Sequence, residues 1–193
     1  MSKNVLIIAG PNGSGKTTFV TEYLRESESS VYISADAIAE RLVPRPEEMD
    51  SVKVQAGRLF IQEIQELIQA GTDFIVEVTL AGKGFARTIS QLKSAGYKVA
   101  IVFIFLKSPE TSVDRVRNRV QAGGHHVPTE DVVRRFYRSK RNFWYTYRNL
   151  VDRWSLFYNS TEHFQEQDLR KMRGEQQILQ DLRKILVIFL SYG

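Results

Sequence analysis

Cysteine is absent from this chain of 193 residues. Its absence excludes disulfides, thiolate metal sites and cysteine nucleophiles, and it favours a reducing, cytoplasmic compartment. Long hydrophobic runs are also missing: Ile185–Leu190 has six residues, whereas a transmembrane helix needs about 20. The apolar run Val5–Ala9 is too short for the core of a signal peptide and leads into glycines. We therefore expect a cytoplasmic protein with neither a signal peptide nor a membrane span.

The rest of the composition is that of a globular domain with one unusual segment. Hydrophobic residues make up 42% of the chain and charged residues 25%, which is ordinary for a folded protein. The net charge is +5, but the segment Asp114–Arg153 alone carries nine Arg and one Lys against four acids. Because the remainder is close to neutral, this favours a local anion site, such as one for phosphate, over nucleic-acid binding.

Short apolar runs alternate with helical patterns, which predicts a three-layer α/β fold. We expect a mostly parallel five-stranded sheet with helices on both faces. Residues 1–160 would form the core, and residues 161–193 a C-terminal helical tail of the same domain. The predicted strands are 4–9, 31–34, 74–79, 98–106 and 155–159. The longer predicted helices are 16–26, 50–70, 84–95, 109–120 and 129–152, with a short helix before the proline-containing loop 43–48.

A glycine-rich loop between the first predicted strand and helix matches the P-loop pattern G-x-x-x-x-G-K-[ST]. Glycines let backbone N–H groups turn toward phosphate oxygens without Cβ clashes, and the helix N-terminus attracts anions. We predict that Lys16 contacts the β- and γ-phosphates of ATP and that the Thr17 hydroxyl binds Mg²⁺. The predicted nucleotide-binding residues are Gly10, Asn12, Gly13, Ser14, Gly15, Lys16, Thr17 and Thr18.

Two acids follow or end predicted strands, where ligands bind in parallel sheets. Asp36 comes just after the second strand, and we predict a catalytic base or a metal contact; the alternative is a helix N-cap. Glu77 lies near the end of the third strand, and we predict that it binds substrate together with Thr79; the alternative is a carboxylate in an ion pair. The fourth strand ends without an acid, which favours a small kinase over a motor-type ATPase.

Arginines flank the turn 123–128 (GGHHVP), three before it and four after it. Two helices joined by this turn would form a lid over residues 115–141, and we expect two of the arginines to reach the transferring phosphoryl group. The alternative is a solvated basic face. His125 and His126 lack further ligands at metal-site spacing and are expected to be turn residues. The stretch 134–148 mixes basic and aromatic residues, which indicates either RNA contact or an amphipathic core helix.

These motifs resemble the zeta toxin family of P-loop kinases over about residues 4–160. The resemblance is carried by the P-loop, by SAD at 34–36, by VEVTLAG at 76–82 and by RVQAGGHHVPTEDVVRRFYRSKRNF at 119–143. It implies a parallel-sheet kinase core that uses ATP and Mg²⁺ to phosphorylate a sugar hydroxyl of UDP-N-acetylglucosamine; the alternative acceptor is another hydroxyl compound, such as an antibiotic, a sugar acid or a nucleoside. Whether the chain has an antitoxin protein as a partner stays open at this point.

The resemblance also implies roles for individual residues. Lys16 matches the family's phosphate-binding lysine, and Thr17 matches its Mg²⁺-binding residue. Asp36 matches the carboxylate that takes the proton of the acceptor hydroxyl. Glu77 matches an acid of the substrate pocket. Arg119 and one of Arg134 or Arg135 match the arginines that clamp the phosphates. The chain departs from the family at Val78, where a Thr is expected, and it lacks counterparts of the longer substrate-binding insertions.

The sequence therefore favours an ATP-dependent small-molecule kinase, with Asp36, Lys16, Arg119 and Arg134 in catalysis. Two alternatives remain. One is a nucleotide-binding protein of the toxin–antitoxin type with little turnover. The other is an RNA-directed kinase, although the charge distribution makes nucleic acid a less favoured partner than a small hydroxyl compound.

Overall fold

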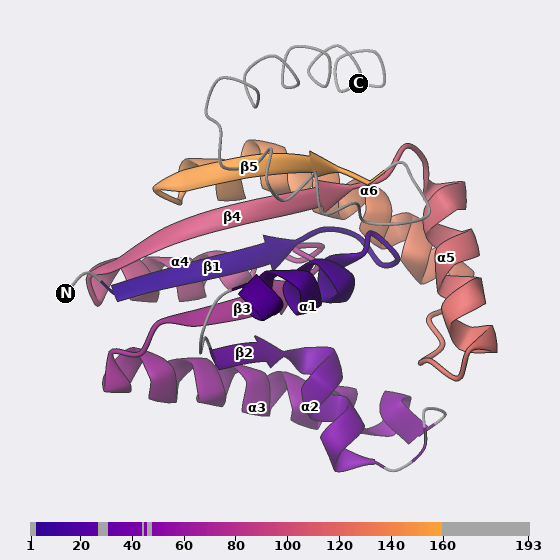
Figure 1. Cartoon of the computed structure of the whole chain (residues 1–193), viewed down its shortest axis with the longest axis horizontal. Helices are drawn as coiled ribbons and strands as arrows, with labels where there is room; N and C mark the ends of the chain where they lie inside the picture. The colour runs from indigo at the N-terminus through magenta and orange to yellow at the C-terminus, as the bar shows by residue number, and fades with distance from the viewer. Residues whose placement is uncertain (1–2, 27–30, 44, 46–47, 160–193) are drawn as a thin grey trace. The chain divides into compact units, whose positions relative to one another are not determined.

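The computed structural model describes residues 3–26, 31–43, 45 and 48–159 (Figure 1). Its centre is a five-stranded sheet in which every pair of neighbouring strands is parallel, in the order β2-β3-β1-β4-β5. The predicted tail, 161–193, lies outside the described residues. The strands are β1 (Lys3–Ala9), β2 (Val31–Ser34), β3 (Phe74–Val78), β4 (Tyr97–Phe105) and β5 (Arg153–Tyr158).

Helices cover both faces of the sheet, which confirms the predicted α/β fold (Figure 1). Phe143 of α6 stacks on Phe103 of β4, while Phe19 of α1 packs on Phe157 of β5. Phe157 pairs in register with Ile104, the residue after Phe103, and successive strand residues point to opposite faces. The helices α1 and α6 therefore lie on opposite faces. The helices are α1 (Lys16–Glu26), α2 (Ala35–Leu42), α3 (Met49–Ala70), α4 (Phe85–Ser94), α5 (Pro109–Gln121) and α6 (Thr129–Tyr145).

The central strands β1 and β4 are buried on both faces, as their continuous apolar sequences predict. Ile7 and Ile8 are both fully buried, and so are Phe103 and Ile104. None of the helices in the described part of the chain is long and apolar enough to cross a membrane.

The strand order places the P-loop and both predicted acids at one edge of the sheet. Because β3 is the neighbour of β1, Glu77 pairs in register with Ile8, two residues before Gly10. Ser34, the last residue of β2, pairs in register with Glu77. The carboxyl ends of β1, β2 and β3 therefore meet where parallel sheets bind ligands.

Helix α6 ends earlier than predicted. The sequence pattern indicates a helix over 129–152, but α6 stops at Tyr145 and a short 3₁₀ helix follows at Tyr147–Asn149. Asp152 is already joined to β4: its N–H donates to Val99 O at 2.9 Å, and Val99 N–H donates to Asp152 Oδ2 at 2.8 Å. The prediction was wrong here because tertiary pairing overrides a local helical pattern.

Candidate active site

The P-loop fits so tightly against its neighbours that two of its glycines admit no side chain. Gly10 has a φ of 149°, and a Cβ there would lie 2.1 Å from Ile104 O. Gly13 has a φ of 72°, and its Cβ would lie 2.8 Å from Ser112 O. Glycine alone tolerates this combination of backbone conformation and close approach.

Side chains from distant parts of the chain fasten the same loop. Ser112 of α5 donates its hydroxyl to Asn12 O, and the Asn159 side chain donates to Ser14 O at 3.0 Å. Asn12 Oδ1 and Ser14 Oγ are buried and have no hydrogen-bond partner among the described residues. Buried polar atoms are rarely left unpaired. A rigid loop with inward-turned glycines and unpaired polar atoms fits a bound triphosphate.

Lys16 lies at the centre of a group of charged residues and is only 7% exposed. Its Nζ donates to Pro11 O at 3.1 Å and lies 3.8 Å from Glu77 Oε1. Burial lowers the pKa of Lys16, the negative charges of Glu77 and Asp36 raise it, and Arg119 and Arg135 lower it again. The charges of both predicted acids and of two arginines thus act on the predicted lysine.

Glu77 is hydrogen-bonded to the Thr17 hydroxyl, the group that the sequence predicts to bind Mg²⁺. Its Oε2 accepts from Thr17 Oγ1 at 3.0 Å and from the Tyr32 hydroxyl at 2.7 Å. Burial and the charge of Glu77 raise the pKa of Tyr32, so its hydroxyl stays protonated and donates. A carboxylate beside the Thr17 hydroxyl is a donor set that Mg²⁺ accepts. The acid beside the P-loop thus comes from β3, the strand next to β1, and not from the fourth strand.

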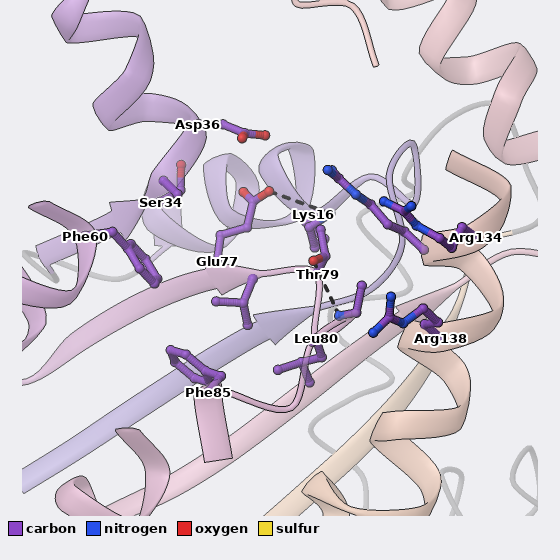
Figure 2. Close-up of a pocket in the computed structure, with 16 residues that line it drawn as sticks. Lys16, Ser34, Asp36, Phe60, Glu77, Thr79, Leu80, Phe85, Arg134 and Arg138 are labelled. Carbon is purple, nitrogen blue, oxygen red and sulfur yellow. Dashed lines mark hydrogen bonds and ion pairs between the residues drawn. The ribbon is translucent and has the colours of Figure 1, made fainter. Parts of the chain in front are cut away.

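Asp36 does not cap helix α2. The Ser34 hydroxyl accepts from Ala37 N–H at 3.0 Å and is the N-cap, so the capping alternative for Asp36 is wrong. Asp36 instead sits in the first turn and lines the same cavity as Lys16 and Glu77. Figure 2 shows its carboxylate on the side of the cavity nearest α2.

The cavity beside these residues has a volume of about 470 Å³ and two chemically different walls (Figure 2). One wall is apolar and consists of the rings of Phe60 and Phe85, whose centroids are 6.3 Å apart. Another wall belongs to α6 and carries Arg134, Arg135 and Arg138, and residues 78–82, at the end of β3 and just after it, line the cavity beside α6. Phe60, Phe85 and Ser34 are lining residues that sequence reasoning missed. Thr79 lines the cavity as well, and exposed Thr18 does not.

The predicted lid arginines separate into two groups. Arg134, Arg135 and Arg138 line the cavity. Arg134 and Arg135 form ion pairs with Asp131 at 2.8 and 3.6 Å. Arg138 forms no ion pair with any residue that the structure describes. Arg119 lies outside the cavity lining and donates to His125 O at 3.0 Å in the turn after α5. Its charge still lowers the pKa of Lys16. Helix α6 therefore supplies the arginines of the cavity, and Arg119 lies nearby.

Three of the six aromatic residues of the stretch 134–148 belong to the core. Phe136, Phe143 and Tyr147 are fully buried, which confirms the prediction of an amphipathic core helix. Tyr137 and Tyr145 are exposed.

A P-loop, a lysine, acids at the ends of neighbouring strands and an arginine-bearing helix, all on a parallel sheet, define the class of P-loop kinases. The comparison with family models agrees: the zeta toxin model matches residues 1–162, and the chain belongs to the zeta toxin family. A relative from Haemophilus influenzae, an uncharacterized protein, is 28% identical over 137 residues, or 71% of this chain and 94% of that protein.

Solved structures that share the fold include the following two. One comes from the PezAT chromosomal toxin–antitoxin system of Streptococcus pneumoniae, with a TM-score of 0.61, 17% identity, and coverage of 94% of this chain and 87% of that one. The other is AvrRxo1-ORF1 with ORF2 and ATP, with a TM-score of 0.65 and 16% identity. That likeness covers 82% of this chain but only 55% of the AvrRxo1 chain, so this chain spans about half of it.

Proposed function

We propose that the protein transfers the γ-phosphoryl group of ATP to a hydroxyl group of a small-molecule acceptor. The observation that carries the proposal is one cavity that brings together the P-loop lysine, Asp36, Glu77 and three arginines. A nucleotide-binding loop alone would not need a second, ring-lined wall beside it. Family membership and the kinase fold support the same conclusion.

Each residue of the site has its own role in the proposed reaction. Lys16 and the P-loop amides bind the β- and γ-phosphates. Thr17 and Glu77 would hold Mg²⁺, which neutralises charge on the phosphates when bound. Asp36 accepts the proton of the acceptor hydroxyl, and such base catalysis contributes about 10²–10⁴-fold. The arginines of α6 stabilise the charge on the transferring group and exclude water, which limits hydrolysis of ATP.

The cavity supports a nucleotide sugar as the acceptor, and UDP-N-acetylglucosamine is the first compound to test. Phe60 and Phe85 offer an apolar surface for a flat ring, and α6 has three arginines at the cavity, of which Arg138 is not engaged by Asp131. Guanidinium groups bind phosphates in bidentate fashion. The zeta toxin family and the PezAT neighbour also support an antitoxin-type protein as a partner of this chain.

The test is incubation with ATP, Mg²⁺ and a panel of hydroxyl metabolites that includes UDP-N-acetylglucosamine, with mass spectrometry to find the product that has gained a phosphoryl group. The variant Lys16→Met keeps the length of the side chain but removes its charge, and it should form no product. Lys98→Met, an exposed lysine of β4, is the matched control and should retain full activity. Binding of ATP without transfer to any compound would favour the interaction protein with little turnover.

A further inference from the structure

Helix α6 holds the loop 79–82, which lines the cavity beside it. The Ser139 hydroxyl donates to Thr79 O at 2.5 Å, and the Asn142 side chain donates to Leu80 O at 3.0 Å. Just past the helix, the Tyr147 hydroxyl donates to Gly82 O at 2.5 Å. Ser139 and Tyr147 are fully buried and Asn142 is 7% exposed, so water cannot readily replace these bonds. Three successive parts of one loop are thus bonded to one helical segment.

The loop needs this support because its backbone is strained. Leu80 has a φ of 54°, and no other non-glycine residue in the described part of the chain has a positive φ. A left-handed conformation is unfavourable for a leucine, and it persists where the surroundings fix it. Here Leu80 is 3% exposed and its carbonyl is held by Asn142. Strain of this kind is concentrated at ligand-binding loops, and Leu80 lines the cavity.

The same helix carries the arginines, and the spacing between the two sets of residues is fixed. Ser139 follows Arg138 directly and comes four residues, about one turn, after Arg135. An α-helix moves as a rigid unit over so short a distance. Any shift of α6 that brings its arginines toward a phosphate therefore pulls on the carbonyls of Thr79 and Leu80.

We propose that α6 couples nucleotide binding to the conformation of the acceptor loop 79–82, with Ser139, Asn142 and Tyr147 as positioning residues. The proposal rests on the proposed function, because it requires that the arginines of α6 engage the nucleotide. When they do, the helix draws the loop into its acceptor-binding form. The acceptor then binds more tightly to the nucleotide-loaded protein than to the free protein, and the reverse holds by linkage.

Hydrogen–deuterium exchange on the full chain tests this coupling without knowledge of the acceptor. The probe is the non-hydrolysable analogue AMP-PNP with Mg²⁺, and the readout is the exchange rate of peptides that cover 10–18 and 78–85. In the wild-type protein the analogue should slow exchange in both peptides. We expect a change of about fivefold or more in the loop peptide, at the lower end of usual coupling between sites.

Two conservative substitutions distinguish coupling through α6 from direct contact between the nucleotide and the loop. Ser139→Ala and Tyr147→Phe each remove one donor to the loop and leave the arginines in place. The control is Tyr97→Phe, because Tyr97 is equally buried and donates to Leu67 O and Thr72 O instead. In Ser139→Ala and Tyr147→Phe the loop should lose most of its protection while the P-loop peptide keeps it. Tyr97→Phe should behave as the wild type.

Each other outcome overturns the proposal in a recognisable way. Protection of the P-loop without protection of the loop in the wild type would show that no coupling exists. Protection of the loop that survives in both variants would show that the nucleotide acts on the loop directly. Absence of protection in the P-loop itself would refute nucleotide binding, and with it both the proposed function and the coupling.

Discussion

At the scale of single residues, the role of Asp36 can be separated from a structural one because Ser34 caps the helix. We predict that Asp36→Asn leaves the Tm nearly unchanged, since Asn has the same size. The same change should lower kcat by about 10²-fold or more, because the amide cannot accept the proton of the acceptor hydroxyl. Thermal unfolding and initial rates with the identified acceptor measure the two effects. ATP should still bind, because Lys16 and the P-loop amides are unchanged.

The matched control is a true capping residue. Ser108 caps α5 by accepting from Thr111 N–H, and it does not line the cavity. Ser108→Ala should lower stability by about 1 kcal/mol and leave kcat unchanged. A wild-type kcat in Asp36→Asn would remove Asp36 from the mechanism and make Glu77 the next candidate for the base.

The arginines provide a second matched pair. Arg134 and Arg117 both pair with an aspartate three residues earlier on their helix, but only Arg134 lines the cavity. We predict that Arg134→Ala lowers kcat by at least about tenfold, with a smaller rise in the KM of the acceptor, because it stabilises charge that develops during transfer. Arg117→Ala should change neither constant. Equal, small effects in steady-state kinetics would assign the role to Arg135 or Arg138.

The residues whose types signal phosphate chemistry could be identified from the sequence. The residues that position them through hydrogen bonds were missed. Lys16, Asp36, Glu77 and Arg134 line the cavity as a group. Tyr32, which donates to Glu77, was missed because the two are 45 residues apart and a tyrosine in a strand reads as core. Asn159 contacts the P-loop from 145 residues away, and no local pattern signals such a contact.

At the scale of elements, Asp152 joins α4 to β4 of the sheet. Its carboxylate accepts from Lys93 of α4 and from Val99 N–H of β4, and these bonds lower its pKa below the ordinary 3.8. A lowered pKa means that the stabilisation is complete above 3.8 and is lost as the pH falls through the still lower folded-state value. Acid should therefore weaken this junction.

We predict that Asp152→Asn is less stable than the wild type at about pH 7 and that the difference shrinks as the pH falls below 3.8, because the folded wild-type protein then loses the charge of this carboxylate. Urea unfolding at about pH 7 and at a series of pH values below 3.8 measures the free energies. Lys93→Met should show the same trend, and the double variant should lose less than the sum of the single variants because the residues share one interaction. A difference that stays constant with pH would show that Asp152 acts through packing alone.

Substitution of two glycines by alanine should change the free energy of unfolding in opposite directions. Gly57 lies inside α3, and a Cβ there would meet nothing within 4 Å, so Gly57→Ala should raise the free energy of unfolding by about 0.5–1 kcal/mol. At Gly13 the Cβ would lie 2.8 Å from Ser112 O, and Gly13→Ala should destabilise the protein and abolish nucleotide binding. Chemical unfolding and nucleotide titration check both. Stabilisation by Gly13→Ala would contradict the tight packing of the loop.

Most element boundaries follow from local patterns, and the exception has a clear cause. The strand Val31–Ser34 and the helix Lys16–Glu26 have the predicted bounds, since an apolar run and a helical period mark them. The end of α6 was missed because Tyr147 is fixed by the loop carbonyl of Gly82 and Asp152 by β4, contacts that lie far away in the sequence.

At the scale of the whole molecule, the order of the strands decides what the site can do. Insertion of β3 between β1 and β2 brings Glu77 beside Thr17, although 60 residues separate them. The alternation of strands and helices predicts a parallel sheet but not which strand lies next to β1. The acids could therefore be named from the sequence, whereas their proximity to the P-loop hydroxyl required the fold.

A nucleotide that bridges the P-loop and α6 should stabilise the molecule as a whole. Saturation at about 100 times Kd adds about 2.7 kcal/mol, and for a domain of this size each kcal/mol raises Tm by about 2–4 °C. We therefore predict that AMP-PNP with Mg²⁺ raises the Tm by about 5–10 °C, measured by differential scanning fluorimetry. Lys16→Met should abolish the shift because the phosphates lose their buried cation, whereas Lys98→Met should keep it. A wild-type Tm that stays constant up to saturating nucleotide would refute the assignment of the P-loop as a nucleotide site.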